Sequence, residues 1–210
     1  MGGFSVKEVL AQAKPNDSVV NPAYSGTKIG EGIAAKKAAE EVDLPAPFAD
    51  LNVFRLLLHR PRTAKAMSDL LISLLFGGDL DDRLRELVIM RIGWATGSDY
   101  EWTQHWTIAL ERFGCTEEDL LSVRNWREAS CFGDLERAVL GAVDEVLETG
   151  TLAKESFAGC VALLGNNASI ELVAAVGTWS MISKLARSLE IPLEEGVASW
   201  PPTGVPSPAV

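Results

Sequence analysis

Ser98, Glu101 and His105 are spaced so that their side chains share one face of a helix. Residues three or four positions apart lie one helical turn from each other. A carboxylate beside an imidazole in apolar surroundings can bring both pKa values toward neutrality, as general acid/base catalysis at pH 7 requires. The strip therefore predicts a proton-transfer site. Two structural alternatives stay open: a surface ion pair worth about 0.3 kcal/mol, or a helix-capping box between Ser98 and Glu101.

Helices are the elements that must position this strip. Proline at 61 and glycines at 77, 78 and 97 mark helix ends. Because no strand-like alternation occurs, the sequence predicts an all-α helical bundle of seven or eight helices. Apolar residues recur at helical spacing over 49–60, 62–76, 81–97, 98–114, 134–150 and 168–189, and shorter helices are expected near 116–126 and 153–164. Residues 32–42 could form one further short helix.

The chain divides into three parts. Residues 1–47 are mixed and polar and read as an N-terminal extension or arm, 48–190 as the helical domain, and 191–210 as an extended, Pro-rich tail. The helix at 168–189 is apolar on most sides, which indicates burial in the core or in a subunit interface.

Composition excludes several classes of partner. The net charge of −10 and the lack of a basic cluster argue against nucleic acid. No apolar stretch is long enough for a membrane span, and the N-terminus lacks a signal peptide, so we expect a cytoplasmic protein. The three cysteines include no C-x-x-C pair, which argues against a disulfide framework or a zinc site.

Residues 85–124 are similar to the core of the carboxymuconolactone decarboxylase and alkylhydroperoxidase D-like family. That family has a motif of Glu, eleven residues, Cys, two residues, Cys, three residues and His. Here Glu86, Ser98, Glu101 and His105 stand at the four positions with the same spacing. The resemblance extends from about residue 50 to 190 and implies the family's all-α fold.

Both cysteine positions of the motif lack a thiol in this chain. The peroxidase branch of the family needs one thiolate to attack and a second to resolve, and Cys115, ten residues after His105, cannot replace either. Thiol peroxidase activity is therefore disfavoured. The resemblance instead implies the non-redox branch, with Glu86, His105 and Glu101 as the functional set, no cofactor, and a homo-oligomer: a trimer or hexamer, with a dimer left open.

The hypothesis is a cofactor-independent decarboxylase, isomerase or dehydratase that acts on a small carbonyl acid or lactone. A Glu86/His105 relay moves the proton, Glu101 relays it further or fixes substrate, and Ser98 donates a hydrogen bond to an enolate or carboxylate. A family member that binds a small molecule without catalysis is the alternative. A divalent metal on both carboxylates and the imidazole also stays open, although none is expected.

Four further side chains are candidates for contacts with substrate. Arg85 and Arg91 could bind a carboxylate, since guanidinium pairs well with it, although surface charge on a helix is the simpler interpretation for each. Trp102 and Tyr100 lie beside the polar strip and could contribute aromatic walls to a pocket.

Overall fold

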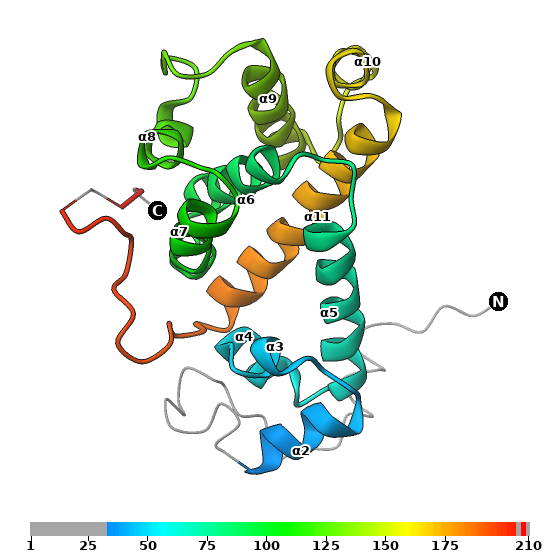
Figure 1. The fold of residues 1–210 in the computed structure, drawn as a ribbon, viewed down its shortest axis with the longest axis vertical. Coiled ribbons are helices and arrows are strands. Elements are labelled where there is room, and N and C mark those ends of the chain that lie inside the picture. The colour runs from blue at the N-terminus through cyan, green and yellow to red at the C-terminus, as the bar shows by residue number, and fades with distance from the viewer. Residues whose placement is uncertain (1–32, 205–206, 209–210) are drawn as a thin grey trace, which may run out of the picture.

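The computed structural model describes residues 33–204, 207 and 208 (Figure 1). Within them the chain is all helical, which confirms the predicted class. The ten α-helices of this part exceed the seven or eight predicted because residues 33–41 do form a helix and an extra short one, at 46–49, precedes the helix expected at 49–60. The elements are α2 (Ile33–Glu41), α3 (Ala46–Ala49), α4 (Asn52–Leu57), α5 (Pro61–Phe76), α6 (Asp82–Thr96), α7 (Asp99–Arg112), α8 (Glu117–Ser122), the 3-10 helix η2 (Val123–Asn125), α9 (Asp134–Thr149), α10 (Lys154–Leu164) and α11 (Asn166–Ser188).

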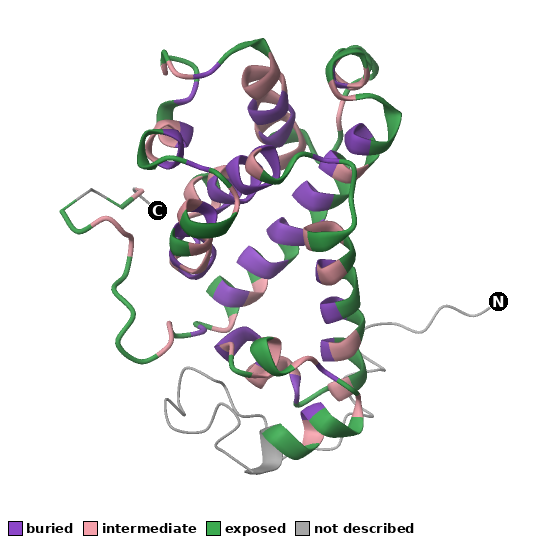
Figure 2. Cartoon of the chain, viewed as in Figure 1, coloured by how far each residue is buried: buried purple, intermediate pink, exposed green. Residues whose placement is uncertain are grey.

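Helix α6 forms the centre of the bundle and packs against α7, α9 and α11. Its residues from Leu84 to Met90 are all buried. Figure 2 draws much of this helix in purple, the colour of buried residues. The Asp81 carboxylate caps the helix by accepting a hydrogen bond from the Leu84 backbone N–H at 3.0 Å. Side chains that α6 directs at its neighbours are therefore held on a rigid, water-excluded support.

A tight turn joins α6 to α7. Gly97 ends α6 with φ 64°, a left-handed conformation that glycine adopts without strain. Four residues earlier, a Cβ on Gly93 would lie 3.0 Å from the backbone nitrogen of Trp102, so glycine permits the close approach of the two helices. The turn and this close contact fix α7 beside α6.

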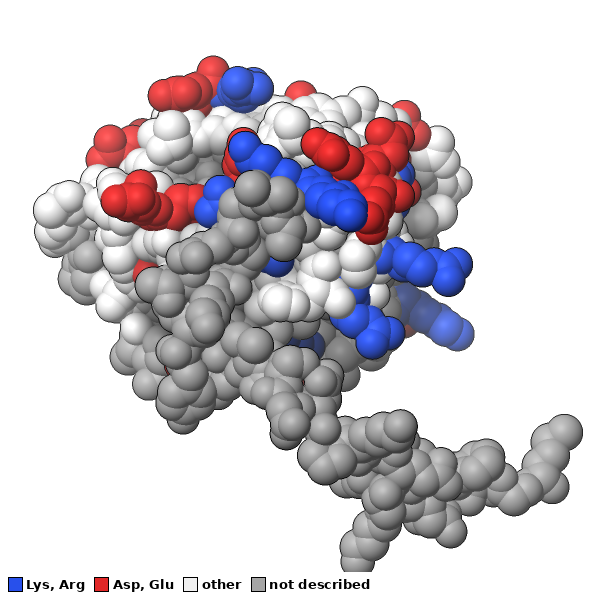
Figure 3. All heavy atoms as spheres, turned by 90° about the horizontal axis from the view of Figure 1, so that it is seen from below, with Lys and Arg blue, Asp and Glu red and all other residues white. Residues whose placement is uncertain are grey.

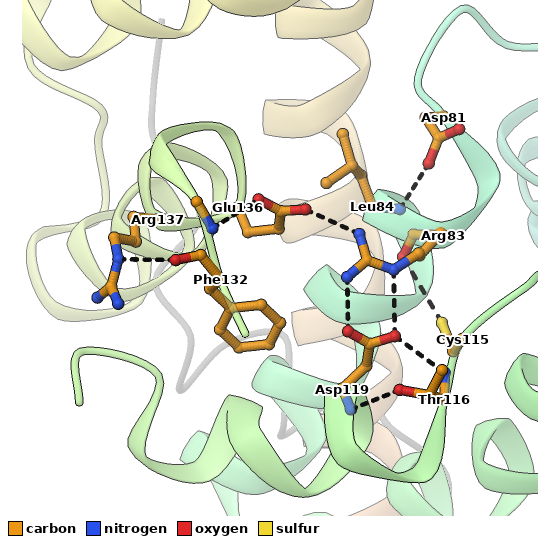
Figure 4. A network of polar contacts seen from close by, with 10 residues as sticks. Asp81, Arg83, Leu84, Cys115, Thr116, Asp119, Phe132, Glu136 and Arg137 are labelled. Atoms are coloured by element: carbon orange, nitrogen blue, oxygen red, sulfur yellow. Dashed lines mark hydrogen bonds and ion pairs between the residues drawn. The ribbon is translucent and has the colours of Figure 1, made fainter. Parts of the chain in front are cut away.

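An ionic cluster ties α8 and α9 to the start of α6 (Figure 4). Arg83 Nη2 donates to Asp119 Oδ1 at 2.5 Å, and Nη1 donates to Glu136 Oε1 at 2.8 Å. Asp119 also completes a capping box with Thr116 at the start of α8. These bonds fix the helices that surround α6 rather than the polar strip on α7.

The tail after α11 packs against the domain. Glu194 Oε1 accepts hydrogen bonds from the Asn52 backbone N–H and the Tyr100 hydroxyl, each at 2.8 Å. The Trp102 indole donates to the Pro201 carbonyl at 2.8 Å. At the other end of the chain, α2 falls within the predicted N-terminal arm, and Ala39 on it is buried in the core; residues 1–32 of that arm lie outside the described residues.

The surface mixes both signs of charge. In the view from below, acidic side chains flank a group of basic ones, and much of the remaining described surface is uncharged (Figure 3). Among the described helices, none has the length and apolarity needed to cross a bilayer.

Candidate active site

Glu86 on α6 and His105 on α7 meet between the two helices. Glu86 Oε2 lies 2.8 Å from His105 Nδ1, and the Glu86 side chain is fully buried, whereas the His105 side chain keeps 15% exposure. A third helix contributes Trp179, whose indole N–H points at His105 Nε2 from 3.3 Å. An Nε2 that accepts a hydrogen bond carries no proton. The neutral imidazole therefore has its proton on Nδ1 and donates it to Glu86.

The surroundings of His105 favour its charged form. Burial lowers the imidazole pKa, but the charge and hydrogen bond of Glu86 outweigh burial and raise the pKa above its ordinary value. After protonation, Nε2–H no longer accepts from Trp179. Glu101 Oε2, 4.0 Å from Nε2, is then an adjacent carboxylate. His105 thus has one arrangement suited to a base and another suited to an acid.

Glu101 is a buried carboxyl group beside this pair, with 3% residue exposure. Burial is the main cause that raises its pKa to about 7; the imidazole opposes the rise and the Glu86 carboxylate adds to it. A carboxyl group with this pKa exchanges its proton near neutral pH. A carboxyl group with this pKa can act as an acid or a base, and the catalytic role of Glu101 stays a prediction.

Ser98 immediately precedes α7 and is fully buried, but its hydroxyl makes no hydrogen bond within the described residues. The capping box considered from the Ser98–Glu101 spacing is not formed, since no side-chain cap bond is present at Ser98. Leaving a buried hydroxyl without a partner costs about 1–3 kcal/mol. Helix capping therefore does not explain why a serine is buried at position 98. Its hydroxyl can form a hydrogen bond with a bound ligand.

Arg85 belongs to the site through Glu86. It is 2% exposed, so the interpretation as simple surface charge is wrong. Its Nη1 binds Asp82 Oδ1 at 2.5 Å, its Nη2 lies 3.4 Å from Glu86 Oε1, and its guanidinium stacks 4.6 Å from the centre of the Phe113 ring. Arg85 balances the buried Glu86 charge.

The other predicted substrate contacts have different partners. Arg91 Nε binds Asp144 at 2.6 Å, and the Tyr100 hydroxyl binds Glu194. The Trp102 ring is enclosed by neighbouring indoles, with Trp106 stacked at 5.7 Å and Trp200 of the tail at 5.9 Å. Contacts of Arg91, Tyr100 and Trp102 with substrate stay predictions.

The Cys115 thiol and the arrangement of possible metal ligands bear on two other kinds of chemistry. Burial raises the pKa of the Cys115 thiol to about 12, which keeps it protonated at neutral pH. Within residues 33–204, 207 and 208, no three His, Cys, Asp or Glu side chains are grouped so that they could hold a metal ion.

The sequence did not predict the contact of Trp179 with His105 or the contacts that the tail makes with the domain. Trp179 is 74 positions from His105, in a helix whose apolar residues gave no sign of which one faces the imidazole. Its burial was foreseeable from the apolar character of 168–189, but its contact with Nε2 was not.

Comparisons with known proteins agree with the sequence-based resemblance. Residues 61–145, which contain all four motif positions, match the model of the carboxymuconolactone decarboxylase family. A protein of unknown function from Agrobacterium tumefaciens, suggested to be the antioxidant defence protein AhpD, has a similar structure with TM-score 0.59 and 23% identity, over 66% of this chain and 96% of that one. The apo debrominase Bmp8 has TM-score 0.60 and 16% identity, over 77% and 84%. No curated protein matches the sequence.

Those matches confirm the family resemblance over 61–145 and the AhpD-like helical fold. They support, in general, a family of enzymes that act on small molecules. The reaction has to be argued from the site itself.

Proposed function

We propose, from the carboxymuconolactone decarboxylase core over residues 61–145, that this protein is a cofactor-independent lyase or isomerase for a small carbonyl acid or lactone. The observation that carries the proposal is the 2.8 Å pair of Glu86 and His105, with protonatable Glu101 beside it. A base, a partner for its charged form and a second acid are the groups that proton transfer at carbon requires.

His105 acts as the base in the first step. Its Nε2 takes a proton from a carbon next to a carbonyl, and Glu86 stabilises the imidazolium that forms. Substrate replaces the hydrogen bond that Trp179 makes to Nε2, which frees the indole N–H to donate to a substrate oxygen. Removal of the proton leaves an enolate, whose negative charge is on oxygen.

Glu101 and Ser98 act on the enolate. The Ser98 hydroxyl, which has no partner among the described residues, donates a hydrogen bond to the enolate oxygen. Neutral Glu101 returns a proton to another carbon, which completes an isomerisation. In a decarboxylation, loss of CO₂ produces the enolate directly, and either Glu101 or the imidazolium protonates it. In the isomerisation the imidazolium then passes its proton to Glu101, which restores both groups. In the decarboxylation, solvent replaces the proton that the enolate takes. Neither route needs a cofactor.

Self-association is part of the proposal. The outward face of α11 exposes Ile170 (61%), Val173 (36%) and Met181 (39%), one to two turns apart. Several exposed apolar side chains on one helix are consistent with a contact with another chain. It supports the homo-oligomer that the family resemblance implies, and sedimentation of the full chain would measure its size.

Solvent exchange tests the chemistry before the natural substrate is known. Lactones, β-keto acids and hydroxy acids would be incubated with the full-length protein in D₂O, with NMR used to follow deuterium entry next to the carbonyl and product formation. His105→Gln should lower the rate for a responsive compound by about 10²–10⁴-fold, the usual contribution of a general base. His59→Gln is the matched control, because His59 is the other histidine and is exposed.

Unchanged turnover in His105→Gln, with helical content retained by circular dichroism, would contradict the mechanism. If no compound reacts and a small molecule remains bound intact through purification, the binding-protein alternative replaces the enzyme proposal.

A further inference from the structure

A pocket lies at the C-terminal ends of α6 and α11, away from the candidate active site. The pocket has a volume of about 470 Å³, within the range of small-molecule sites. None of its lining residues is acidic, although the chain as a whole carries a net charge of −10. The lining residues are Arg91, Trp94, Ala95, Thr96, Gly97, Arg124, Arg187 and Pro208. We propose that this pocket binds a small ligand through a dianionic oxyanion, a phosphate group in the first instance.

The local charge is strongly positive. Arg91 and Arg127 both bind one carboxylate, that of Asp144, at 2.6 and 2.9 Å. Arg124 and Arg187 have no carboxylate partner within the described part of the chain. The three lining guanidinium groups and Arg127 beside them therefore share one carboxylate, and a dianion restores the balance better than a monoanion. A single chloride or acetate leaves most of the excess charge in place.

Two of the three lining arginines, Arg124 and Arg187, are each anchored by a hydrogen bond and keep further N–H donors for a ligand. Arg124 Nε binds the Leu121 carbonyl at 2.8 Å and Arg187 Nη1 binds the Thr96 carbonyl at 2.5 Å. Among the described residues, no hydrogen bond involves either terminal nitrogen of Arg124, or Nε and Nη2 of Arg187. Guanidinium groups held in this way lose little freedom on binding, and their forked N–H groups match phosphate oxygens.

Backbone carbonyls at the pocket are already neutralised. A helix C-terminus is partly negative and disfavours anions, but the Arg187 guanidinium covers the Thr96 carbonyl at the end of α6. The Val123 and Arg124 carbonyls accept from Arg91 Nη1 at 3.0 and 3.1 Å. The arginines therefore present net positive charge toward the pocket.

An aromatic wall completes the site. The Arg124 guanidinium lies 5.5 Å from the centre of the Trp94 ring, and this half-buried ring lines the pocket. An indole face beside an oxyanion site suits the organic part of a phosphorylated molecule. The ligand class is therefore a small phosphate ester rather than bare phosphate alone.

The pocket is separate from the candidate active site. Arg187 follows Trp179 by eight residues on α11, and Trp94 follows Glu86 by eight residues on α6, which corresponds to about 12 Å along each helix. Binding at the arginine pocket can therefore be measured without knowledge of the reaction, and failure here leaves the acid/base proposal intact.

Calorimetric titration of the full chain with inorganic phosphate, at an ionic strength held constant with chloride, tests the inference. We expect saturable binding, displacement by a phosphate ester such as glycerol phosphate, and at least tenfold weaker binding of acetate. The variant Arg124→Gln with Arg187→Gln should lose at least tenfold in phosphate affinity. Lys184→Gln, which removes one exposed positive charge from α11 outside the pocket, should keep wild-type affinity.

Two results would overturn the site: no saturable phosphate binding by the wild type, or equal affinity in the wild type and the double-arginine variant. If circular dichroism shows that the double variant is unfolded, Arg187→Lys decides. Lysine keeps the positive charge but lacks the paired N–H donors of the guanidinium, so this variant should fold and bind phosphate several-fold more weakly. Unchanged phosphate affinity would exclude a guanidinium contact with the ligand.

Discussion

The polar side chains on the two faces of α7 differ in how completely they are hydrogen-bonded. On the outer face, Asp99 accepts hydrogen bonds from the Thr103 hydroxyl, the Ser199 hydroxyl and the Trp200 backbone N–H at 2.7, 2.5 and 3.0 Å. On the inner face, the buried Ser98 hydroxyl has no partner among the described residues, and Glu101 is 4.0 Å from His105 Nε2, beyond hydrogen-bond distance.

On this one helix, the fully hydrogen-bonded groups therefore serve stability, and the incompletely bonded groups are the ones suited to chemistry. Satisfied polar groups hold the tail to the domain and gain nothing from a ligand. Incompletely satisfied buried groups cost stability, and a substrate with matching oxygens can recover that cost. Four substitutions test this division, in order of decreasing expected effect.

Glu86→Gln should have the largest effect because it removes the charge that stabilises the imidazolium while retaining the side-chain shape. We expect kcat/KM for a responsive compound to fall by about 10²-fold or more, and the His105 pKa, measured by NMR titration, to fall as well. Asp82→Asn is the matched control, since it removes a 61% exposed carboxylate on the other side of Arg85 and should change both quantities little.

Glu101→Gln should alter the pH dependence of stability. Because the Glu101 pKa is about 7 in the fold and near 4.5 when unfolded, the folded state holds an extra proton between these values. The free energy of unfolding of the wild type therefore declines as the pH rises from about 4.5 to 7, by up to about 3 kcal/mol. The variant should lack this decline, as denaturant titrations at pH 5 and pH 8 would reveal; parallel curves for both proteins would exclude a buried neutral Glu101.

Glu194→Ala tests the bonds that hold the tail to the domain. It deprives the Asn52 backbone N–H and the Tyr100 hydroxyl of their shared acceptor, so we expect the free energy of unfolding to fall by about 2 kcal/mol. Glu195→Ala, at the exposed neighbouring position, should change it by less than about 0.5 kcal/mol. Equal losses in the two variants would show that the tail is not held by specific bonds.

Ser98→Ala should have the smallest effect on stability and the opposite sign. Removing a buried hydroxyl without a partner should leave the protein unchanged or stabilise it by up to about 1 kcal/mol, whereas turnover should fall. A clear loss of thermal stability in this variant would indicate that Ser98 has a structural partner and is not reserved for substrate.

The sequence predicted the part of the site that lies within one helical hairpin. The spacing from Glu86 to His105 was readable because both residues lie on consecutive helices with a glycine turn between them. Helical spacing says nothing about partners from distant segments, so Trp179 and Glu194 were not found. The cap considered at Ser98 is absent for a related reason: a capping spacing only permits the bond, and no side-chain cap bond is formed at Ser98.

The short separation of Glu86 and His105 along the chain also bears on the order of folding. Only 19 positions separate them, so the contact closes a small loop, whereas the bonds from Asp99 to Ser199 and Trp200 span 100 and 101 positions. Local contacts form faster and at lower entropic cost than distant ones. During synthesis the ribosome releases the hairpin long before residue 199 exists. The reactive pair can therefore assemble while the outer side of α7 still faces water, and attachment of the tail is the last step to complete the domain.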